Sequence, residues 1–279
     1  MSSKYSPDAL IHRLPWVTKR IPVVRLSGLI AHREGAIHLD RFAPVLDRGF
    51  AMAEATEGTL ILAIDSPGGS PVQSDLIGRY LRRKAGRTEV TLLAVIGDVG
   101  ASGGYWIACA ADTIIANPMS VVGSIGVVGG GFGVPDLIRR LGIERRIVTA
   151  GEHKLRNDPF SPRRKEDEEF TRALLDDIHV AFKDWVRERR GNRIAGNEAA
   201  IFDGSYMLGD RAKALGLIDS FGDVRSVIAE RFGDEAEPLF LQPRKPFTAL
   251  RLLGGGAGAG LGATLLDTIE RELAGLSLR

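Results

Sequence analysis

A serine surrounded by small residues stands where a buried strand is expected to end and a helix to begin. Ser102 follows the apolar run VTLLAVI and lies in the segment GASGGY, with Gly103 and Gly104 directly after it. Two glycines in a first helical turn cost roughly 1 kcal/mol each relative to alanine, and close approach of a substrate backbone would explain them. Such a turn projects the Ser102 hydroxyl and leaves the Gly103 N–H free to bind a developing oxyanion. Ser102 is therefore a candidate nucleophile. From this segment alone, a serine that only caps a tightly packed helix is an equal alternative.

A second glycine-rich turn, DSPGGS at residues 65–70, follows the apolar run TLILAI. Its two glycines permit backbone conformations closed to other residues and let a ligand approach the chain closely. The N–H groups at the start of the following helix favour negative charge at the same place. No Gly-Lys-Ser/Thr follows, which excludes a Walker phosphate loop, and a simple tight turn is the alternative.

A nucleophilic serine needs a base, and the chain offers five histidines and many lysines. Nothing in the sequence places a histidine near Ser102, since His32 and His38 flank a predicted loop and His179 lies in a predicted long helix. Lys154, in the segment TAGEHK, is the better candidate. A lysine acts as a base only where burial lowers its pKa, and most lysines are simply solvated.

These residues are positioned by an alternation of short apolar strands and amphipathic helices, which indicates a layered α/β fold. Several strands are continuous apolar runs, as in strands covered by helices on both faces. A long helix is expected to start at Ser161-Pro162 and to pack through a stripe that recurs every four residues from Phe170 to Val186. From Pro238 onward no strong pattern is visible, apart from a Gly-rich linker at 254–260 and a short helix at 263–276. The predicted strands are Ile21–Leu26, Thr59–Ile64, Val90–Ile96, Thr113–Ala116 and Arg146–Thr149, and the other predicted helices are His38–Glu54, Ser70–Lys84, Ser102–Ala111, Pro135–Leu141, Gly209–Leu215 and Val224–Phe232.

Composition narrows the classes of partner. The net charge is only +2, from 37 basic and 35 acidic side chains, and no basic run is interleaved with aromatic residues, so we expect no nucleic-acid partner. The single cysteine, Cys109, excludes an intrachain disulfide framework, and its apolar neighbours indicate buried packing. No His/Cys/Asp/Glu cluster has metal-ligand spacing, so we expect neither a metal nor another cofactor.

The N-terminal residues hold no apolar stretch like a signal peptide or anchor. We therefore expect no transmembrane segment, a cytoplasmic location and at most peripheral contact with the inner membrane.

Taken in order along the chain, PGGS, GASGGY, a Gly-Ser-Ile-Gly at residues 123–126 and GEHK resemble the S49 signal peptide peptidase family. The separation of Ser102 and Lys154 matches the Ser/Lys dyad of that family, and the resemblance extends from about Ile21 to Phe232. It implies the ClpP/crotonase fold, an α/β layered spiral of parallel strands and helices. The expected parts are an N-terminal arm at 1–20, a peptidase domain at 21–235 and a Gly-rich, helical C-terminal extension at 236–279.

The same resemblance implies a role for each site residue. Ser102 corresponds to the nucleophile and Lys154 to the general base. Gly69 and Gly103 correspond to the positions whose N–H groups form the oxyanion hole, and Ser124 lies where a hydroxyl could orient the lysine amine. The implied activity is hydrolysis of peptide bonds in peptides, unfolded proteins or signal-peptide remnants, within a ring-like homo-oligomer.

Two other functions remain open. A crotonase-type acyl-CoA enzyme shares the layered fold and stabilises an enolate with paired backbone N–H groups. It needs neither a nucleophilic serine at a helix start nor a buried lysine, and candidates for both are present. A catalytically silent scaffold of the same fold is the other alternative, although the chain keeps both dyad positions.

Overall fold

The structure of the chain is a computed structural model that describes residues 19–243, all of which belong to one compact unit. The linker expected at 254–260, the helix expected at 263–276 and most of the expected N-terminal arm lie outside the described residues. The strands are β1 (Arg20–Ser27), β2 (Thr59–Ser66), β3 (Thr91–Ala101), β4 (Thr113–Ala116), β5 (Val121–Gly123), β6 (Tyr206–Leu208), β7 (Ser220–Phe221) and β8 (Glu237–Leu241). The α-helices are α2 (Leu39–Ala55), α3 (Pro71–Thr88), α4 (Gly103–Ala108), α5 (Pro135–Arg140), α6 (Lys165–Arg190), α7 (Glu198–Ile201), α8 (Gly209–Ala214) and α9 (Val224–Phe232).

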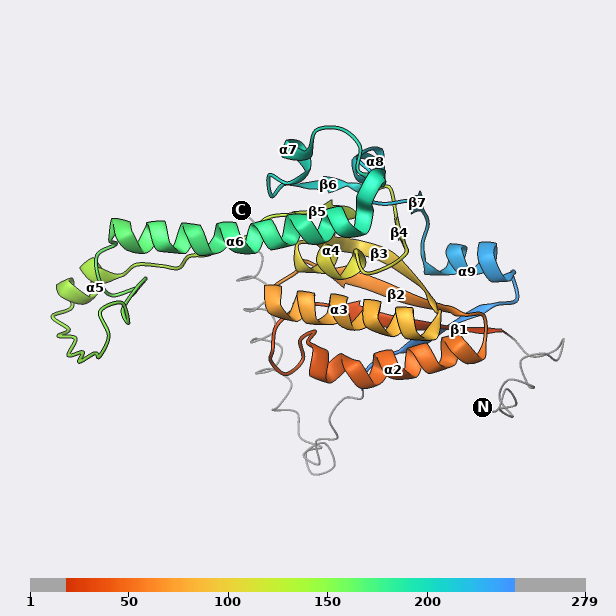
Figure 1. The fold of residues 1–279 in the computed structure, drawn as a ribbon. Helices are drawn as coiled ribbons and strands as arrows, with labels where there is room; N and C mark the ends of the chain where they lie inside the picture. The colour runs from red at the N-terminus through yellow and green to blue at the C-terminus, as the bar shows by residue number, and fades with distance from the viewer. Residues whose placement is uncertain (1–18, 244–279) are drawn as a thin grey trace, which may run out of the picture. The chain divides into compact units, whose positions relative to one another are not determined.

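A single sheet organises these elements (Figure 1). Its strands follow the order β6-β5-β3-β2-β1-β8, while β4 pairs with β3 and β7. All pairs are parallel except β5 with β6. The long strand β3 has two neighbours on one edge, because residues 93–96 pair with β4 and residues 99–101 pair with β5. A mostly parallel sheet between helices confirms the predicted layered α/β fold.

The central strands are buried on both faces, which explains their continuous apolar runs. In β2, Leu60 and Leu62 belong to the larger core, which α2, α3 and α4 help to build. Ile61 points to the opposite face and joins a smaller core with Val227 and Ile228 of α9. The strands β1 and β3 alternate between the two cores in the same way.

Four strands are absent from the sequence-based prediction. The strands β5, β6 and β7 have only two or three residues each, too few for a periodic pattern. The fourth, β8, pairs in parallel with β1 along residues 237–241. These residues are therefore part of the sheet, although the sequence placed them in the C-terminal extension.

Two predictions between β5 and α6 are wrong. Arg146–Thr149 is not a strand, because no strand lies beside it and its Val148 is 100% exposed. The helix α6 begins at Lys165 rather than at Ser161-Pro162. The Ser161 hydroxyl instead donates a hydrogen bond to Asp158, within a turn that precedes the helix.

The helix α6 packs against the layers of the fold along its C-terminal part. Phe182 and Val186 of the predicted apolar stripe are buried, whereas Phe170 and Leu174 are each 50% exposed. Figure 1 shows that the first half of α6 extends beyond the layers and that α5 and its connecting loops lie at its outer end. Residues 127–164, here called the arm, are mostly exposed. Within residues 19–243, no helix is both long and apolar enough to cross a membrane.

Candidate active site

Ser102 occupies a strained turn between β3 and α4. Its backbone has φ 51° and ψ −123°, a positive φ that non-glycine residues adopt rarely and at a cost of about 1–3 kcal/mol. Two hydrogen bonds hold the turn: the Ser102 N–H donates to Gly123 O at 2.8 Å, and the Trp106 N–H donates to Ser102 O at 2.9 Å. The side chain of Ser102 makes no capping hydrogen bond to α4. A strained strand-to-helix turn with a half-buried, uncommitted hydroxyl is the local geometry of a nucleophile elbow.

The glycine turn after β2 lies directly against this serine. A Cβ added to Gly68 would be 2.7 Å from the Ser102 Cβ, 2.7 Å from Gly103 N and 3.0 Å from the Ser102 Oγ. A Cβ added to Gly69 would collide with the backbone of Ile30. Both glycines also have positive φ, +105° and +139°. The two glycine-rich segments therefore meet, as expected for the carboxyl ends of neighbouring parallel strands.

The backbone pairing of this turn orients the Gly69 N–H. The Ile30 N–H donates to Gly68 O and the Ser70 N–H donates to Ile30 O, each at 2.8 Å. Because successive peptide groups of an extended chain point to opposite sides, the Gly69 N–H points away from Ile30. Within residues 19–243, neither the Gly69 N–H nor the Gly103 N–H donates a hydrogen bond to a protein acceptor. Two uncommitted donors thus lie on the segments that flank the Ser102 hydroxyl.

Two buried serines support these segments, and the sequence reasoning missed both. Ser66 is 1% exposed, and its hydroxyl accepts a hydrogen bond from the Gly68 N–H at 3.1 Å. Ser74 is fully buried, donates to Ser70 O at 2.9 Å and fills the space next to Gly103. The available signal was the recurrence of small residues through DSPGGS and into the first turn of α3.

Ser124 directly follows Gly123, whose carbonyl accepts a hydrogen bond from the Ser102 N–H. It has φ 51°, and its own N–H donates to Ser205 O at 2.8 Å, which continues the pairing of β5 with β6. The backbone at Ser124 is therefore fixed beside the elbow. Next to it, the Ile125 carbonyl lies 3.0 Å from His179 Nε2, a contact that ties α6 to this segment.

Lys154 lies apart from Ser102 in this chain. It is an exposed residue of the arm, in a turn where its N–H donates to Gly151 O at 3.3 Å. No hydrogen bond or ion pair within residues 19–243 joins Lys154 to Ser102. His153 is also exposed on the arm, and Figure 1 shows the segment between β5 and α6 extending away from the layers that contain β3 and α4, so the fold of one chain brings neither candidate base to the serine.

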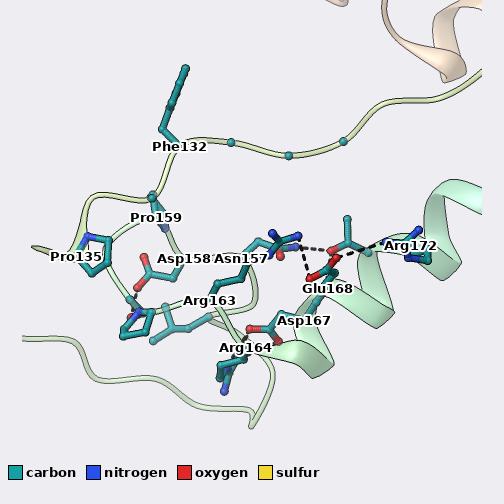
Figure 2. Close-up of a pocket in the computed structure, with 18 of the residues that line it drawn as sticks. Phe132, Pro135, Asn157, Asp158, Pro159, Arg163, Arg164, Asp167, Glu168 and Arg172 are labelled. Atoms are coloured by element: carbon teal, nitrogen blue, oxygen red, sulfur yellow. Dashed lines mark hydrogen bonds and ion pairs between the residues drawn. The ribbon is translucent and has the colours of Figure 1, made fainter.

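A cavity with a volume of about 1540 Å³ lies between the arm and the first half of α6. Figure 2 shows its charged wall, where Arg164 and Asp167 are joined at 2.8 Å at the start of α6. Asp158, which also lines the cavity, forms an ion pair with Arg145, and Figure 2 shows that Phe132 projects away from the labelled charged residues. Neither Ser102 nor Lys154 lines this cavity.

The remaining titratable candidates give no alternative nucleophile. Cys109 is fully buried, and burial raises the pKa of its thiol to about 12, so the thiolate does not form at neutral pH. This agrees with the packing role predicted for it.

Among the described residues, His32, His38 and Asp40 form one group whose potential metal-ligand atoms lie within 4.8 Å of one another. The sequence reasoning did not recognise that group.

Comparisons with known proteins bear on the family of the chain. A sequence model described as peptidase family S49 matches residues 84–234, more than half of the chain. The chain is 30% identical over 213 residues to the putative protease MJ0651 of Methanocaldococcus jannaschii, covering 74% of this chain and 68% of that protein. It is 42% identical over 248 residues to a Na(+)/H(+) antiporter NhaA of Brucella abortus, covering 88% of this chain. The chain spans only about a third (33%) of the length of that relative.

A solved structure bears on the fold. A mutant of the 1510-N membrane-bound stomatin-specific protease superposes with a TM-score of 0.50 at 14% identity, covering 82% of this chain and 100% of that one. This likeness agrees with the ClpP-like layered fold expected from the sequence. Because the S49 family model matches more than half of the chain, and the chain is 30% identical to a putative protease of which it covers 68%, the chain belongs to peptidase family S49.

Proposed function

We propose that this chain is a serine peptidase in which Ser102 is the nucleophile. The observation that carries the proposal is the strained turn, which presents an uncommitted hydroxyl between two backbone N–H groups without protein acceptors. Strain of this kind persists only where the surrounding structure holds it, and it gathers at functional sites. The two N–H groups, of Gly69 and Gly103, are placed to bind negative charge that develops beside the serine.

In the proposed reaction, the Ser102 Oγ attacks the carbonyl carbon of the scissile peptide bond and its proton passes to the amine of the base. The carbonyl oxygen becomes negative and accepts hydrogen bonds from Gly69 and Gly103. Collapse of this intermediate breaks the C–N bond, and the base returns the proton to the leaving amine. Water then hydrolyses the acyl ester by the same steps, which releases the acid and restores the serine.

Lys154 is the proposed base, and we propose that it reaches Ser102 from a neighbouring copy of the chain. Two observations support this arrangement. Lys154 lies on the arm, apart from the elbow of its own chain, so an intermolecular route is the simplest one without refolding. The arm also exposes large apolar side chains, which an assembly would bury. Among them, Val128 is 95% exposed and Phe132 is 91% exposed.

A mixing experiment tests this proposal. Ser102→Ala and Lys154→Met should each be inactive as pure proteins. After unfolding and refolding together in equal amounts, a site is complete wherever a chain with Ser102 adjoins a chain with Lys154. Random assembly gives such a pair at about a quarter of the sites, so the mixture should recover about a quarter of wild-type peptidase activity. A mixture that assembles but stays inactive would contradict donation of the lysine by a neighbour.

A fluorophosphonate probe separates the peptidase from the other candidate functions, because it reacts with activated serines. We expect the wild-type chain to be labelled and Ser102→Ala to be unlabelled. A crotonase-type acyl-CoA enzyme or a silent scaffold would leave both proteins unlabelled. Ser124→Ala should slow labelling less than Ser102→Ala, as expected for a hydroxyl that only orients the lysine amine.

The proposed substrates are peptides or unfolded protein segments, including signal-peptide remnants, bound inside a ring-like homo-oligomer. The cytoplasmic location, with peripheral contact to the inner membrane, stays a prediction from the sequence. Enclosure would protect folded proteins, because only an extended chain could reach a site formed between two copies.

A further inference from the structure

The loop between β1 and α2 brings two histidines together. The Ala31 N–H donates to Ile37 O at 3.0 Å, and the Ile37 N–H donates to Leu29 O at 2.9 Å. These two bonds pair Ile30 with Ile37 in a parallel bridge, and His32 and His38 follow two residues and one residue after the paired positions. Their rings stack with centroids 5.0 Å apart and planes at 18°.

A carboxylate completes the group. Asp40 lies in the first turn of α2, and its Oδ2 is 3.8 Å from His32 Nε2. One nitrogen from each ring and one Asp40 oxygen lie within 4.8 Å of one another. The His32 and Asp40 side chains are 66% and 79% exposed, so small rotations can bring all three atoms to the roughly 2.0–2.2 Å bonds of a zinc site.

His38 has a ring nitrogen without a hydrogen-bond partner in the described part of the chain, and a bound cation would supply one. Nδ1 of His38 is buried and has no hydrogen-bond partner among residues 19–243. Buried polar atoms are nearly always paired in folded proteins, and an exception calls for an explanation. A metal ion bound at this nitrogen would supply the missing partner, since a neutral imidazole nitrogen is among the commonest metal ligands.

We propose that His32, His38 and Asp40 bind a divalent transition-metal ion of the Zn²⁺ class, with water in the remaining position. Two imidazole nitrogens and one carboxylate oxygen suit zinc and its neighbours better than Mg²⁺ or Ca²⁺, which prefer oxygen ligands. The ion would join the loop to the start of α2.

Bound metal would stiffen the chain next to the glycine turn. Ile30, in the same loop, holds Gly68 and Ser70 through the two 2.8 Å hydrogen bonds. The Leu39 N–H, beside His38, donates to the side chain of Gln73 on α3 at 2.9 Å. The ion is therefore a structural one, which fixes the support of the Gly68–Ser70 segment without touching substrate.

Zinc titration of the full chain, freed of metal with a chelator and competed with a chromogenic chelator, tests the site. We expect saturable binding of one Zn²⁺ per chain. His32→Ala and Asp40→Asn should each weaken binding at least about tenfold. His153→Ala removes an exposed histidine on the arm and should bind zinc like the wild type.

Thermal unfolding gives a second readout that does not depend on peptidase activity. Zinc should raise the Tm of the wild type and of His153→Ala, and should leave the Tm of His32→Ala unchanged, because only a metal bound to the folded state stabilises it. Absence of saturable zinc binding by the wild type would overturn the proposal. So would a folded His32→Ala/Asp40→Asn double variant that binds zinc within about twofold of the wild type. Because both side chains are exposed, these variants should fold even where a change at His38 does not.

Discussion

Replacing Gly68 by alanine tests whether the glycine turn sets the position of the Ser102 hydroxyl. The added Cβ would lie 2.7 Å from the Ser102 Cβ and from Gly103 N, whereas ordinary contacts begin at 3.4 Å. The two segments must therefore separate by about 0.7 Å, the difference between 2.7 and 3.4 Å. A displacement of about 1 Å at reacting groups can lower a rate about 100-fold. We expect Gly68→Ala to slow fluorophosphonate labelling of Ser102 by a factor of that order.

Gly68 has φ +105°, so an alanine there strains the backbone whatever the neighbouring atoms. A matched control must separate this strain from the effect on Ser102. Gly233 has φ +95° and follows α9, and a Cβ added there has nothing within 4 Å. Each alanine should cost about 1–3 kcal/mol of the free energy of unfolding through backbone strain. Only Gly68→Ala should also slow the fluorophosphonate labelling of Ser102. If folded Gly68→Ala labels within about twofold of Gly233→Ala, the turn does not position the nucleophile and the reasoning fails.

Three further predictions concern other residues. Asp219→Asn should lower the free energy of unfolding by about 3–5 kcal/mol in urea titrations, because Asp219 pairs at 2.8 and 2.9 Å with Arg190, whose side chain is 1% exposed. Although burial acts to raise it, the Arg190 guanidinium holds the pKa of Asp219 below its ordinary value. The stabilisation is therefore present above pH ~4 and is lost as the pH falls further, so an Asp219→Asn difference that persisted undiminished in acid would contradict this account. Cys109 should react with iodoacetamide at pH 8 only after unfolding, because burial raises the pKa of its thiol to about 12; labelling of the native chain would show otherwise. Lys154→Met and Lys154→Arg should abolish hydrolysis while His153→Ala retains most of it, and the reverse result would make the histidine the base.

The strands that are buried on both faces could be predicted from the sequence alone. Continuous apolar runs predicted β1 to β4 and the helices between them, because burial selects such runs. The pairing of β2 with β3 brings the DSPGGS and GASGGY segments together, since the carboxyl ends of parallel neighbours share one edge. Before the structure, only the family resemblance implied that Gly69, Gly103 and Ser102 share one site.

Features that depend on long-range pairing or on a second molecule were not predictable in this way. The short strands β5, β6 and β7 exist only because each is paired to another segment. The approach of His32 to His38 depends on the pairing of Ile30 with Ile37, which periodicity does not reveal. Arg146–Thr149 has the apolar composition of a strand but no sheet to join. The sequence also gave no sign that Lys154 would lie on an arm apart from Ser102.

The pairing of β1 with β8 has a consequence for how the chain is made. Residues 20–24 near the start of the described chain lie beside residues 237–241. On a ribosome, one edge of β1 stays without its partner until the strand β8 has emerged. Unpaired strand edges can join other chains, so a nascent chain of this kind is exposed to misassembly until residues 237–241 have emerged. The sheet gains β8 only after residue 241 has emerged, and a chain that ended before residue 237 would have an open β1 edge.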